Sequence, residues 1–142
     1  MDYAHSEYII FLDADDVFDK NLLKLTCEKA INHKAEVVWV DSVSKDQLSG
    51  RKIDHSRYSF AKNKFPKKLL FKFSEIKGNP YRAFNGWTWD KLFSLKYLRN
   101  HGFRFQEQQI ANDGYFTYLS MTIANRIATI DKKLVTHIIH DK

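Results

Sequence analysis

The feature that most constrains the fold is a short apolar run that ends abruptly in carboxylates. Glu7 to Leu12 is almost entirely apolar, and Asp13-Ala14-Asp15-Asp16 follows it directly. A continuous apolar run of this length predicts a strand that is buried on both faces. Open α/β sheets bind their ligands beyond the carboxyl ends of such strands. We therefore expect the acidic cluster at a ligand-binding edge of a sheet.

The residues after the cluster predict a helix and then a second strand. Asp19 is expected to cap the helix, which ends near His33. Glu36 to Val43 is rich in β-branched and aromatic residues and predicts a strand. A strand, a helix and a strand indicate an α/β fold with a parallel or mixed sheet flanked by helices. The residues on the expected inner face of this helix are Leu22, Leu23, Thr26, Cys27, Ala30 and Ile31.

The distal half alternates turn signals with short periodic segments. Gly78-Asn79-Pro80 and Asn85-Gly86 mark turns. Asn112 is expected to cap a helix from Asp113 to about Ala124 whose inward side chains are Phe116, Leu119, Ile123 and Tyr115. The other expected elements are a loop over Ser44–Lys64, helical spacing within Phe65–Ser74, a short helix over Ser94–His101 closed by Gly102, a strand at Phe103–Phe105, and one or two closing strands within Arg126–Ile139.

Length and composition favour one domain over residues 1–142. The single cysteine, Cys27, excludes an internal disulfide framework and fits a reducing compartment. No apolar run approaches the roughly 20 residues needed to cross a bilayer. The first residues lack the basic and apolar regions of a signal peptide. The expected location is the cytoplasm, either free or at the inner face of the membrane.

The chain is basic, with a formal net charge of +6. Much of the excess lies between Arg51 and Arg82, where it forms either a solvated surface or a patch that faces phosphates or anionic lipid. There is no zinc-finger spacing, no aromatic RNA-binding signature and no basic heptad array. Nucleic acid is therefore not a predicted partner.

The acidic cluster has the composition of a metal site. In an extended backbone Asp13 and Asp15 point the same way, whereas Asp16 turns aside. Adjacent carboxylates repel one another, so burying them needs a compensating cation or hydrogen-bond donors. Oxygen ligands suit Mg²⁺ or Mn²⁺, which are commonly held by one or two carboxylates together with substrate phosphates. The alternative is an exposed acidic turn that caps the following helix.

The stretch Ala4-His5-Ser6-Glu7-Tyr8-Ile9-Ile10-Phe11-Leu12-Asp13-Ala14-Asp15-Asp16 resembles the family-2 glycosyltransferases. In that family a short "Ala-x-Gly-Glu-Tyr" segment precedes "hydrophobic-Leu-Asp-x-Asp-Asp", and Ser6 departs from the usual glycine. The resemblance implies a GT-A fold in which Asp15 is the main metal ligand. It also implies that Asp13 contacts the ribose or the metal-bound water and that Asp16 supports the site. These three aspartates would together bind a nucleotide-diphospho-sugar donor.

The distal half is similar to the same family in three further segments, and in the same order. Trp89-Asp90-Lys91-Leu92-Phe93 resembles "Trp-x-Lys-Leu-Phe/Tyr", Phe103-Arg104-Phe105 follows, and Asn112-Asp113-Gly114-Tyr115-Phe116 resembles "Glu-Asp-x-x-Phe". By this resemblance Asp113 is the catalytic base, although Asn112 replaces the usual acidic residue.

Trp87, Trp89 and Asn112 are the expected acceptor-binding residues. The tryptophans could offer a flat apolar face to a sugar ring, and the alternative is that they only pack in the core. Trp89 is expected in the core or the acceptor cleft, and Trp87 nearer the surface. GT-A enzymes often use a late histidine as a third metal ligand. By this resemblance His137 and His140 are the two candidates, and His140 is the expected ligand. A histidine that binds no metal is the alternative for each.

The acidic cluster also resembles the first motif of haloacid dehalogenase-type phosphatases. In that reading Asp13 is the phosphoryl nucleophile and Asp15 the general acid and base. The reading requires a second acidic motif on a later strand, and nothing after residue 100 supplies one. A non-catalytic binding module that keeps the fold is the other alternative.

A complete family-2 domain has two upstream nucleotide-binding motifs that do not occur in this chain. The resemblance therefore implies the C-terminal half of the domain, a partial GT-A fold with the N-terminal nucleotide-binding half missing. Such a chain is expected to be inactive alone and to form homodimers through the unpaired edge of the Glu7–Leu12 strand. The whole enzyme is expected to be an inverting transferase of cell-surface polysaccharide assembly. It would use Mn²⁺ or Mg²⁺, a UDP-sugar donor and a polysaccharide or glycolipid acceptor.

Overall fold

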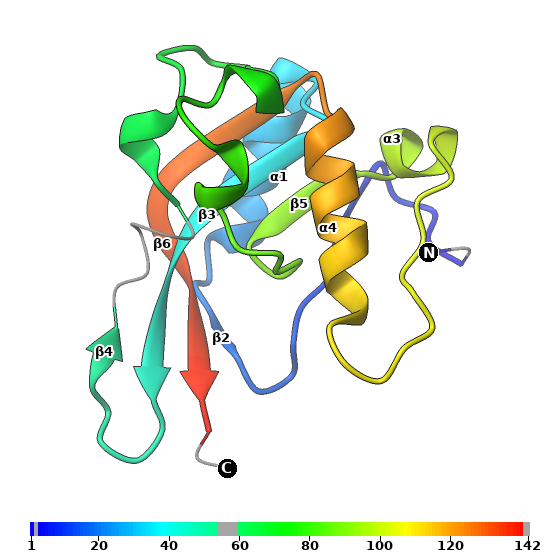
Figure 1. Cartoon of the computed structure of the whole chain (residues 1–142). Coiled ribbons are helices and arrows are strands. Elements are labelled where there is room, and N and C mark those ends of the chain that lie inside the picture. Colours follow the sequence, from blue (N-terminus) through cyan, green and yellow to red (C-terminus); the bar gives the residue numbers. More distant parts are fainter. Residues whose placement is uncertain (2, 54–59, 141–142) are drawn as a thin grey trace.

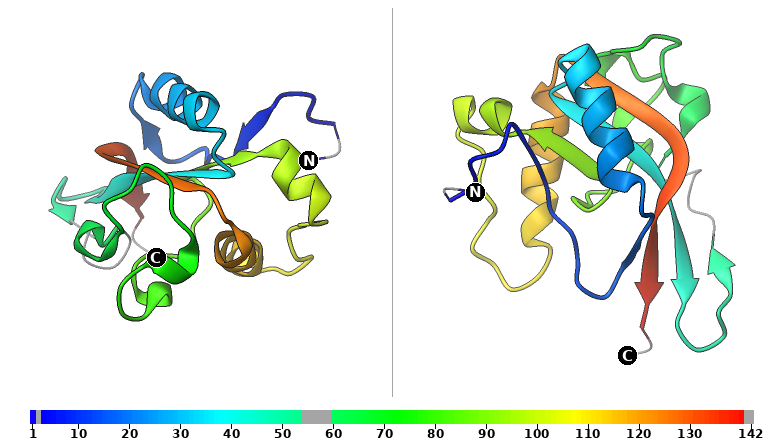
Figure 2. Two further views of the ribbon diagram at one scale, coloured as in Figure 1. Left: turned by 90° about the horizontal axis from the view of Figure 1, so that it is seen from above. Right: turned by 180° about the vertical axis from the view of Figure 1, so that it is seen from behind.

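The protein folds as a curled mixed sheet with helices on both faces (Figure 1). The structure is a computed structural model that describes residues 1, 3–53 and 60–140. Seen from above, α1 (Leu22–His33) covers one face of the sheet (Figure 2). The other face is covered by α4 (Asn112–Ile123) and by the irregular segment that precedes β5. The α/β class and the mixed sheet expected from the sequence are confirmed.

In the described residues the strand order is β1-β5-β3-β6-β2, and β4 pairs with β3 outside this path. The strands are β1 (Tyr8–Ile10), β2 (Val17–Phe18), β3 (Val37–Asp46), β4 (Lys52–Ile53), β5 (Lys91–Ser94) and β6 (Ile127–Ile139). β3 and β6 are parallel along their whole length, with register shifts around Asp41. All the other pairs are antiparallel.

The first strand differs from its expectation in two ways. It covers only Tyr8 to Ile10 and is half-buried, and Leu12, which follows it, has 43% of its surface exposed. It also does not neighbour β3 as a simple strand–helix–strand unit would predict. β5 lies between them and pairs antiparallel with both. The acidic residues nevertheless follow the carboxyl end of β1, as expected.

Helix positions agree with the sequence, but two caps do not. Asn21, not Asp19, is the cap residue of α1; the Asp19 carboxylate accepts a hydrogen bond from the Asn21 backbone N–H at 2.8 Å. Ala111, not Asn112, precedes α4, in a left-handed conformation with φ 54°. The short helix α3 (Leu95–Asn100) is confirmed; the Ser94 hydroxyl accepts from the Tyr97 N–H.

The buried faces of α1 and α4 are narrower than the periodicity indicates. Leu23 and Ile31 of α1 are more than half exposed, while Leu22, Thr26 and Ala30 are buried. In α4 the side chains of Tyr115 and Ile123 are exposed, and Leu119 packs only at the edge of the core. The fully buried residues of α4 are Phe116, Thr117, Ser120 and Met121. Small polar side chains at two of these positions let the helix pack closely.

Three irregular segments were predicted wrongly. Phe65–Ser74 is not α-helical: the region contains the 3-10 turns η1 (Lys62–Lys64), η2 (Phe73–Glu75) and η3 (Pro80–Arg82), and Phe71 forms an isolated bridge with Ile127. The expected loop over Ser44–Lys64 instead begins with the end of β3 and the β3–β4 hairpin, and residues 54–59 lie outside the described residues. Phe103–Phe105 is not a strand.

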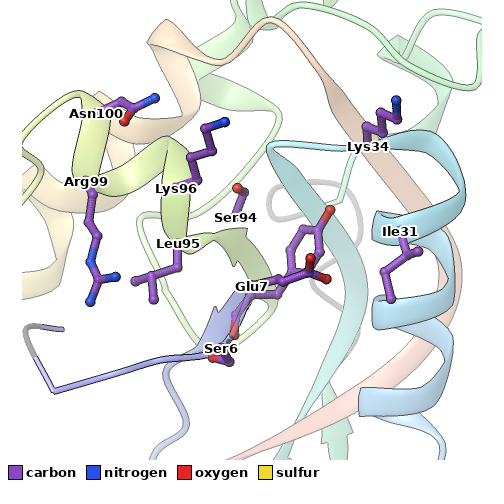
Figure 3. A pocket seen from close by; sticks show the side chains of 10 residues that line it. Ser6, Glu7, Ile31, Lys34, Ser94, Leu95, Lys96, Arg99 and Asn100 are labelled. Atoms are coloured by element: carbon purple, nitrogen blue, oxygen red, sulfur yellow. Dashed lines mark hydrogen bonds between the residues drawn. The ribbon is translucent and has the colours of Figure 1, made fainter.

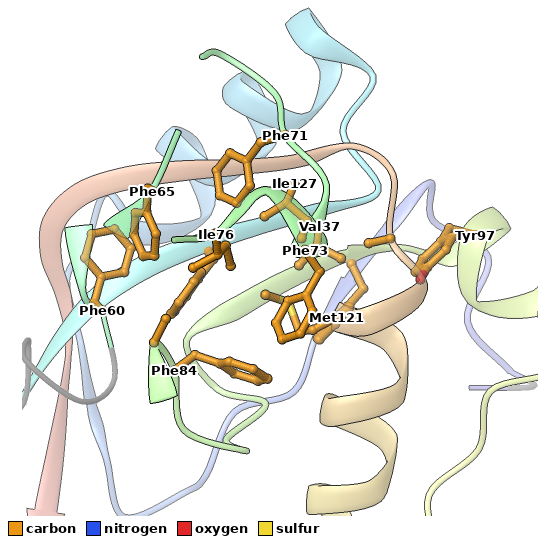
Figure 4. Packing of buried hydrophobic residues seen from close by; sticks show 14 of the residues in the cluster. Val37, Phe60, Phe65, Phe71, Phe73, Ile76, Phe84, Tyr97, Met121 and Ile127 are labelled. Atoms are coloured by element: carbon orange, nitrogen blue, oxygen red, sulfur yellow. The ribbon is translucent and has the colours of Figure 1, made fainter. Parts of the chain in front are cut away.

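Aromatic burial explains these differences. Trp39 of β3 packs against Phe60, Phe65 and Phe84, whose ring centroids lie 5.2, 4.8 and 5.7 Å from its own. Figure 4 shows how rings from the irregular segment gather over the sheet beside Val37 and Ile127. Each ring buries a large apolar area, and this outweighs the weak local preference for a helix. Phe103 and Phe105 likewise pack against Tyr97 and Phe116.

None of the helices in the described ranges is long and apolar enough to cross a bilayer.

Candidate functional site

A cleft of about 390 Å³ lies beyond the carboxyl end of β1. It brings together Asp13 of the acidic turn and Asp113 of the first turn of α4, which are far apart in the sequence. Its lining residues are Phe11, Asp13, Thr88, Phe105, Asn112 and Asp113. Two carboxylates that are 100 residues apart in the sequence therefore line one space together with the aromatic rings of Phe11 and Phe105.

The acidic turn concentrates negative charge at this cleft. Burial raises the pKa of the Asp13 carboxyl, and the neighbouring charges of Asp16, Asp15 and Asp113 raise it further. His137 acts in the opposite direction. A cation bound among these groups would relieve the repulsion, because it stabilises the ionised form of every carboxylate near it.

Asp16 ties the acidic turn to the last strand. Its side chain is fully buried, and Oδ1 accepts hydrogen bonds from His137 Nδ1 and from the Ile138 N–H, each at 2.9 Å. Its other oxygen, Oδ2, is buried without a hydrogen-bond partner. Asp16 thus links the acidic turn to β6 and orients the His137 ring.

Asp15 lies on the open side of the turn, beside a histidine. Its Oδ2 is 3.1 Å from His140 Nε2, and its side chain is 58% exposed. The other ring nitrogen of His140 lies 2.7 Å from Gln47 Oε1, which orients the imidazole. The late histidine selected from the sequence therefore lies next to the aspartate selected as the main metal ligand.

In the part of the chain that the structure describes, no three histidine, cysteine or acidic side chains converge well enough to hold a metal by themselves. Mg²⁺ and Mn²⁺ sites of nucleotide-dependent enzymes commonly use one or two protein carboxylates and take their other ligands from phosphates and water. Asp15 and His140, whose Oδ2 and Nε2 atoms lie 3.1 Å apart, could supply one or two such ligands.

The two tryptophans occupy different depths. Trp89 is 2% exposed and belongs to the core cluster under β6. Trp87 is half-buried and stacks on Trp89 with ring centroids 4.6 Å apart. The His137 ring stacks on Trp89 at 5.5 Å. Trp89 therefore supports Trp87 and His137 from below, as the expectation of one core and one surface tryptophan requires.

A buried ion pair lies beneath the loop that contains these tryptophans. Asp90 and Lys91 are 1% and 0% exposed, and the Lys91 ammonium donates to the Asp90 carboxylate and to the Trp87 carbonyl at 2.7 Å. The Trp39 indole N–H donates to the other Asp90 oxygen at 3.2 Å. Burial raises the pKa of Asp90 and lowers that of Lys91, and their contact opposes both shifts. The pair fixes the loop that carries Trp87 and Thr88.

Sequence reasoning missed several contributors to the site. Phe11 and Phe105 line the cleft with their rings 4.9 Å apart, and Thr88 joins them. Alternation along β1 could have indicated Phe11, which points to the same side as Asp13. Thr88 carries no such signal, and the contact of His137 with Asp16 depends on the pairing of β2 with β6.

A second, larger hollow of about 570 Å³ lies between the free edge of β1, α1 and α3, and Glu7 is the acidic residue that lines it (Figure 3). Its wall combines Lys34, Lys96 and Arg99 with the apolar side chains of Ile31 and Leu95. It contains none of the site residues expected from the sequence.

The fold and the sequence both match known glycosyltransferases. Residues 1–87 match the family model "Glycosyl transferase family 2". Crystal structures of Staphylococcus aureus TarS 1–349 are similar to this chain, with TM-scores of 0.68 for TarS alone, 0.70 with UDP and 0.72 with UDP-GlcNAc. Sequence identity is 21%, 20% and 20%, and the alignments cover 96%, 97% and 99% of this chain.

The chain spans 37% of the length of each of these TarS structures. No curated protein matches its sequence. The family match covers the acidic turn and favours the glycosyltransferase reading of that turn over the phosphatase reading. By its sequence the chain belongs to glycosyl transferase family 2, and it has part of a GT-A glycosyltransferase fold.

Proposed function

We propose that this chain forms the metal-binding and acceptor part of an inverting glycosyltransferase. The enzyme would transfer a sugar from a UDP-sugar to a hydroxyl of a surface polysaccharide or glycolipid. The observation that carries the proposal is the cleft in which Asp13 and Asp113 face each other from distant parts of the chain. The similar TarS structures with UDP and UDP-GlcNAc favour a uridine donor.

The donor side of the proposed site is the acidic turn. Asp15 would be the main ligand of Mn²⁺ or Mg²⁺, with Asp13 and His140 completing the protein's contribution. The bound cation would supply positive charge for the leaving diphosphate. Asp16 would keep the turn in register through His137 and the Ile138 N–H.

The acceptor side is the first turn of α4. Asp113 would accept the proton of the acceptor hydroxyl as that oxygen attacks the anomeric carbon, on the side opposite the departing diphosphate. Asn112 lines the same cleft and would orient the acceptor, and Trp87, supported by Trp89, would offer a flat apolar face.

We expect no useful transfer by this chain alone, because it spans only 37% of the similar TarS structures and a donor pocket draws on more of the fold. Metal-dependent transfer or UDP-sugar hydrolysis by the isolated chain would contradict this expectation. The proposed location is the cytoplasm, with contact to the inner membrane face through lysines of the 62–77 segment. Two lysines of this segment form ion pairs within the chain, Lys62 with Asp131 and Lys68 with Glu75.

The donor site is tested by titrating the full chain with UDP in the presence and absence of Mn²⁺. We expect binding that requires the cation and weakens at least tenfold in Asp15→Ala, since loss of even indirect metal partners costs roughly 10–100-fold. Asp131→Ala, at an exposed aspartate outside the cleft, is the matched control.

UDP binding should also weaken as the pH falls, because the pKa of Asp13 is raised above that of an ordinary aspartate and the carboxylate is protonated earlier. UDP binding that is independent of Mn²⁺ or unchanged in Asp15→Ala would reject the site. No UDP binding at all would favour a chain that keeps the fold without a donor site.

The free edge of β1 supports a proposed homodimer. β1 is the last strand of the described sheet on that side and pairs only with β5. The Glu7 carbonyl accepts from the Leu95 N–H on the paired side, whereas the Tyr8 carbonyl accepts from the Ser6 hydroxyl of its own segment, at 2.6 Å. Unpaired edges of this kind recruit strands from other chains.

A further inference from the structure

Three exposed tyrosines lie on α4 and on the neighbouring turn η3. Tyr115 and Tyr118 lie three residues apart on α4 and so share a helix face, and Tyr81 of η3 continues the row. Their exposed fractions are 55%, 38% and 50%. The rings of Tyr81 and Tyr118 lie 6.1 Å apart, and the Tyr81 hydroxyl is 3.3 Å from Thr122 Oγ1. We call these three residues the tyrosine strip.

Two rings of the strip are held in place by the core beneath them. Tyr118 packs on Phe84 at 5.0 Å, and Tyr81 packs on Phe73 at 5.1 Å. Tyr118 also lies directly on the backbone of Gly86, where an added Cβ would come within 2.9 Å of the ring. Rigid tyrosines bind ligands at low cost in conformational entropy while presenting both an apolar face and a hydroxyl.

The strip meets the acceptor side of the cleft at Gly86. A Cβ at Gly86 would lie 2.9 Å from the Tyr118 ring and 3.5 Å from the Cα of Gly114, the residue after Asp113. Gly86 is also two residues before Thr88, which lines the cleft with Asp113. Asp13 and the metal-binding turn form the other wall. An acceptor that attacks from the Asp113 side has to extend away from the donor, and the wall made by α4 and the 84–88 loop leads onto the strip.

The size and chemistry of the strip suit a glycan better than a protein. Three half-exposed rings offer on the order of 300 Å², well below the roughly 800 Å² that a stable protein partner covers. The hydroxyls and the exposed neighbours Arg82 and Thr122 make the surface mixed rather than apolar. Pyranose rings have the matching combination of an apolar face and polar edges.

We propose that the tyrosine strip binds the acceptor glycan, its rings stacking on successive pyranose units that lead away from the reacting hydroxyl. This inference rests on the proposed function, because it assigns the acceptor to the Asp113 side. It adds a binding surface outside the cleft and defines the acceptor as a chain of several sugars.

The test uses NMR titration of the isotope-labelled full chain with maltotetraose, cellotetraose and chitotetraose, without donor or metal. We expect at least one of these tetrasaccharides to shift the resonances of Tyr81, Tyr115 and Tyr118. The double variant Tyr115→Ala/Tyr118→Leu should weaken that binding about tenfold, since each stacked ring adds a modest increment. Leucine at 118 keeps an apolar side chain over Phe84, and Gly86→Ala displaces the Tyr118 ring without removing it. Tyr3→Ala is the control, as Tyr3 is 95% exposed and lies near the chain start.

The proposal is overturned if no tetrasaccharide shifts the strip, or if the double variant binds as well as the parent. It is also overturned if the strip resonances change with protein concentration alone, since the face would then be a protein contact. The donor site is scored separately by the UDP and Mn²⁺ titration. Sugar binding at the strip without UDP binding would leave this proposal standing and reject the donor site.

Discussion

Lys91 illustrates how one side chain can organise a site that it never reaches. Its ammonium is surrounded by the Asp90 carboxylate and by the carbonyls of Trp87 and Asn85, and it lies 5.3 Å from the centre of the Phe84 ring. A charge buried this completely is tolerated only because each of its donors has a partner. The backbone on either side of Trp87 is fixed as a result, and Thr88 is held at the cleft.

Lys91→Met should therefore destabilise the fold strongly. The variant leaves the buried Asp90 carboxylate without its cation, a change that typically costs about 3–5 kcal/mol. Urea denaturation followed by circular dichroism measures the loss. The double variant Asp90→Asn/Lys91→Met removes both charges and should recover part of it. Equal stability of Lys91→Met and the parent would mean that the pair contributes nothing to the fold.

At the scale of elements, α1 ends in a conformation that its sequence does not favour. Lys34 follows the helix with φ 50° and ψ 43°, the left-handed region in which a Cβ is strained, and its N–H bonds back to the Ala30 and Ile31 carbonyls. Glycine is the usual residue at this position. Lys34 thus makes the usual hydrogen bonds of a helix end, but its left-handed backbone lowers the free energy of unfolding.

Lys34→Gly should stabilise the protein by about 1 kcal/mol, because glycine adopts this conformation without steric penalty. The midpoint of thermal or urea unfolding measures the gain. Lys34→Ala is the matched control: it removes the same charged side chain but keeps the Cβ, so no comparable gain is expected. A similar gain in both variants would assign the effect to charge instead of backbone strain.

Local signals explain which elements the sequence predicts. α1, α3 and β3 were located because turn signals and hydrophobic periodicity lie within a few residues of one another, although the cap of α1 was assigned to the wrong residue. The Phe65–Ser74 segment was predicted wrongly, because its conformation is decided by contacts with Trp39 and Ile127, which no local pattern contains. The same distinction holds at the site. Asp13 and Asp113 were recognisable as motifs, whereas the pairing of Asp16 with His137 arises from the tertiary structure.

At the scale of the whole molecule, the free edge of β1 lies beside the basic hollow of Figure 3. An edge strand presents unpaired backbone groups, and native proteins often protect such edges with lysines. Here Lys34, Lys96 and Arg99 lie close by but line the hollow. The edge itself carries Ser6 and Glu7.

We expect the chain to associate through this edge at high concentration, as measured by light scattering or sedimentation. Ser6→Lys adds a cation at the edge and should shift the chain toward monomer, because two like charges would meet across a dimer. Leu48→Lys, at an exposed position of the β3–β4 hairpin, is the control. A parent chain that stays monomeric, or equal effects of both variants, would remove the edge from consideration.

The parallel pairing of β3 with β6 has a consequence for synthesis on the ribosome. β3 is complete at Asp46, but its long parallel partner begins only at Ile127, and β2 also pairs with β6. At roughly 5–20 residues per second, several seconds pass between the appearance of the two strands. During that interval Val37 to Val40 lack the neighbour that buries them. We therefore expect holding chaperones to bind the nascent chain until β6 emerges.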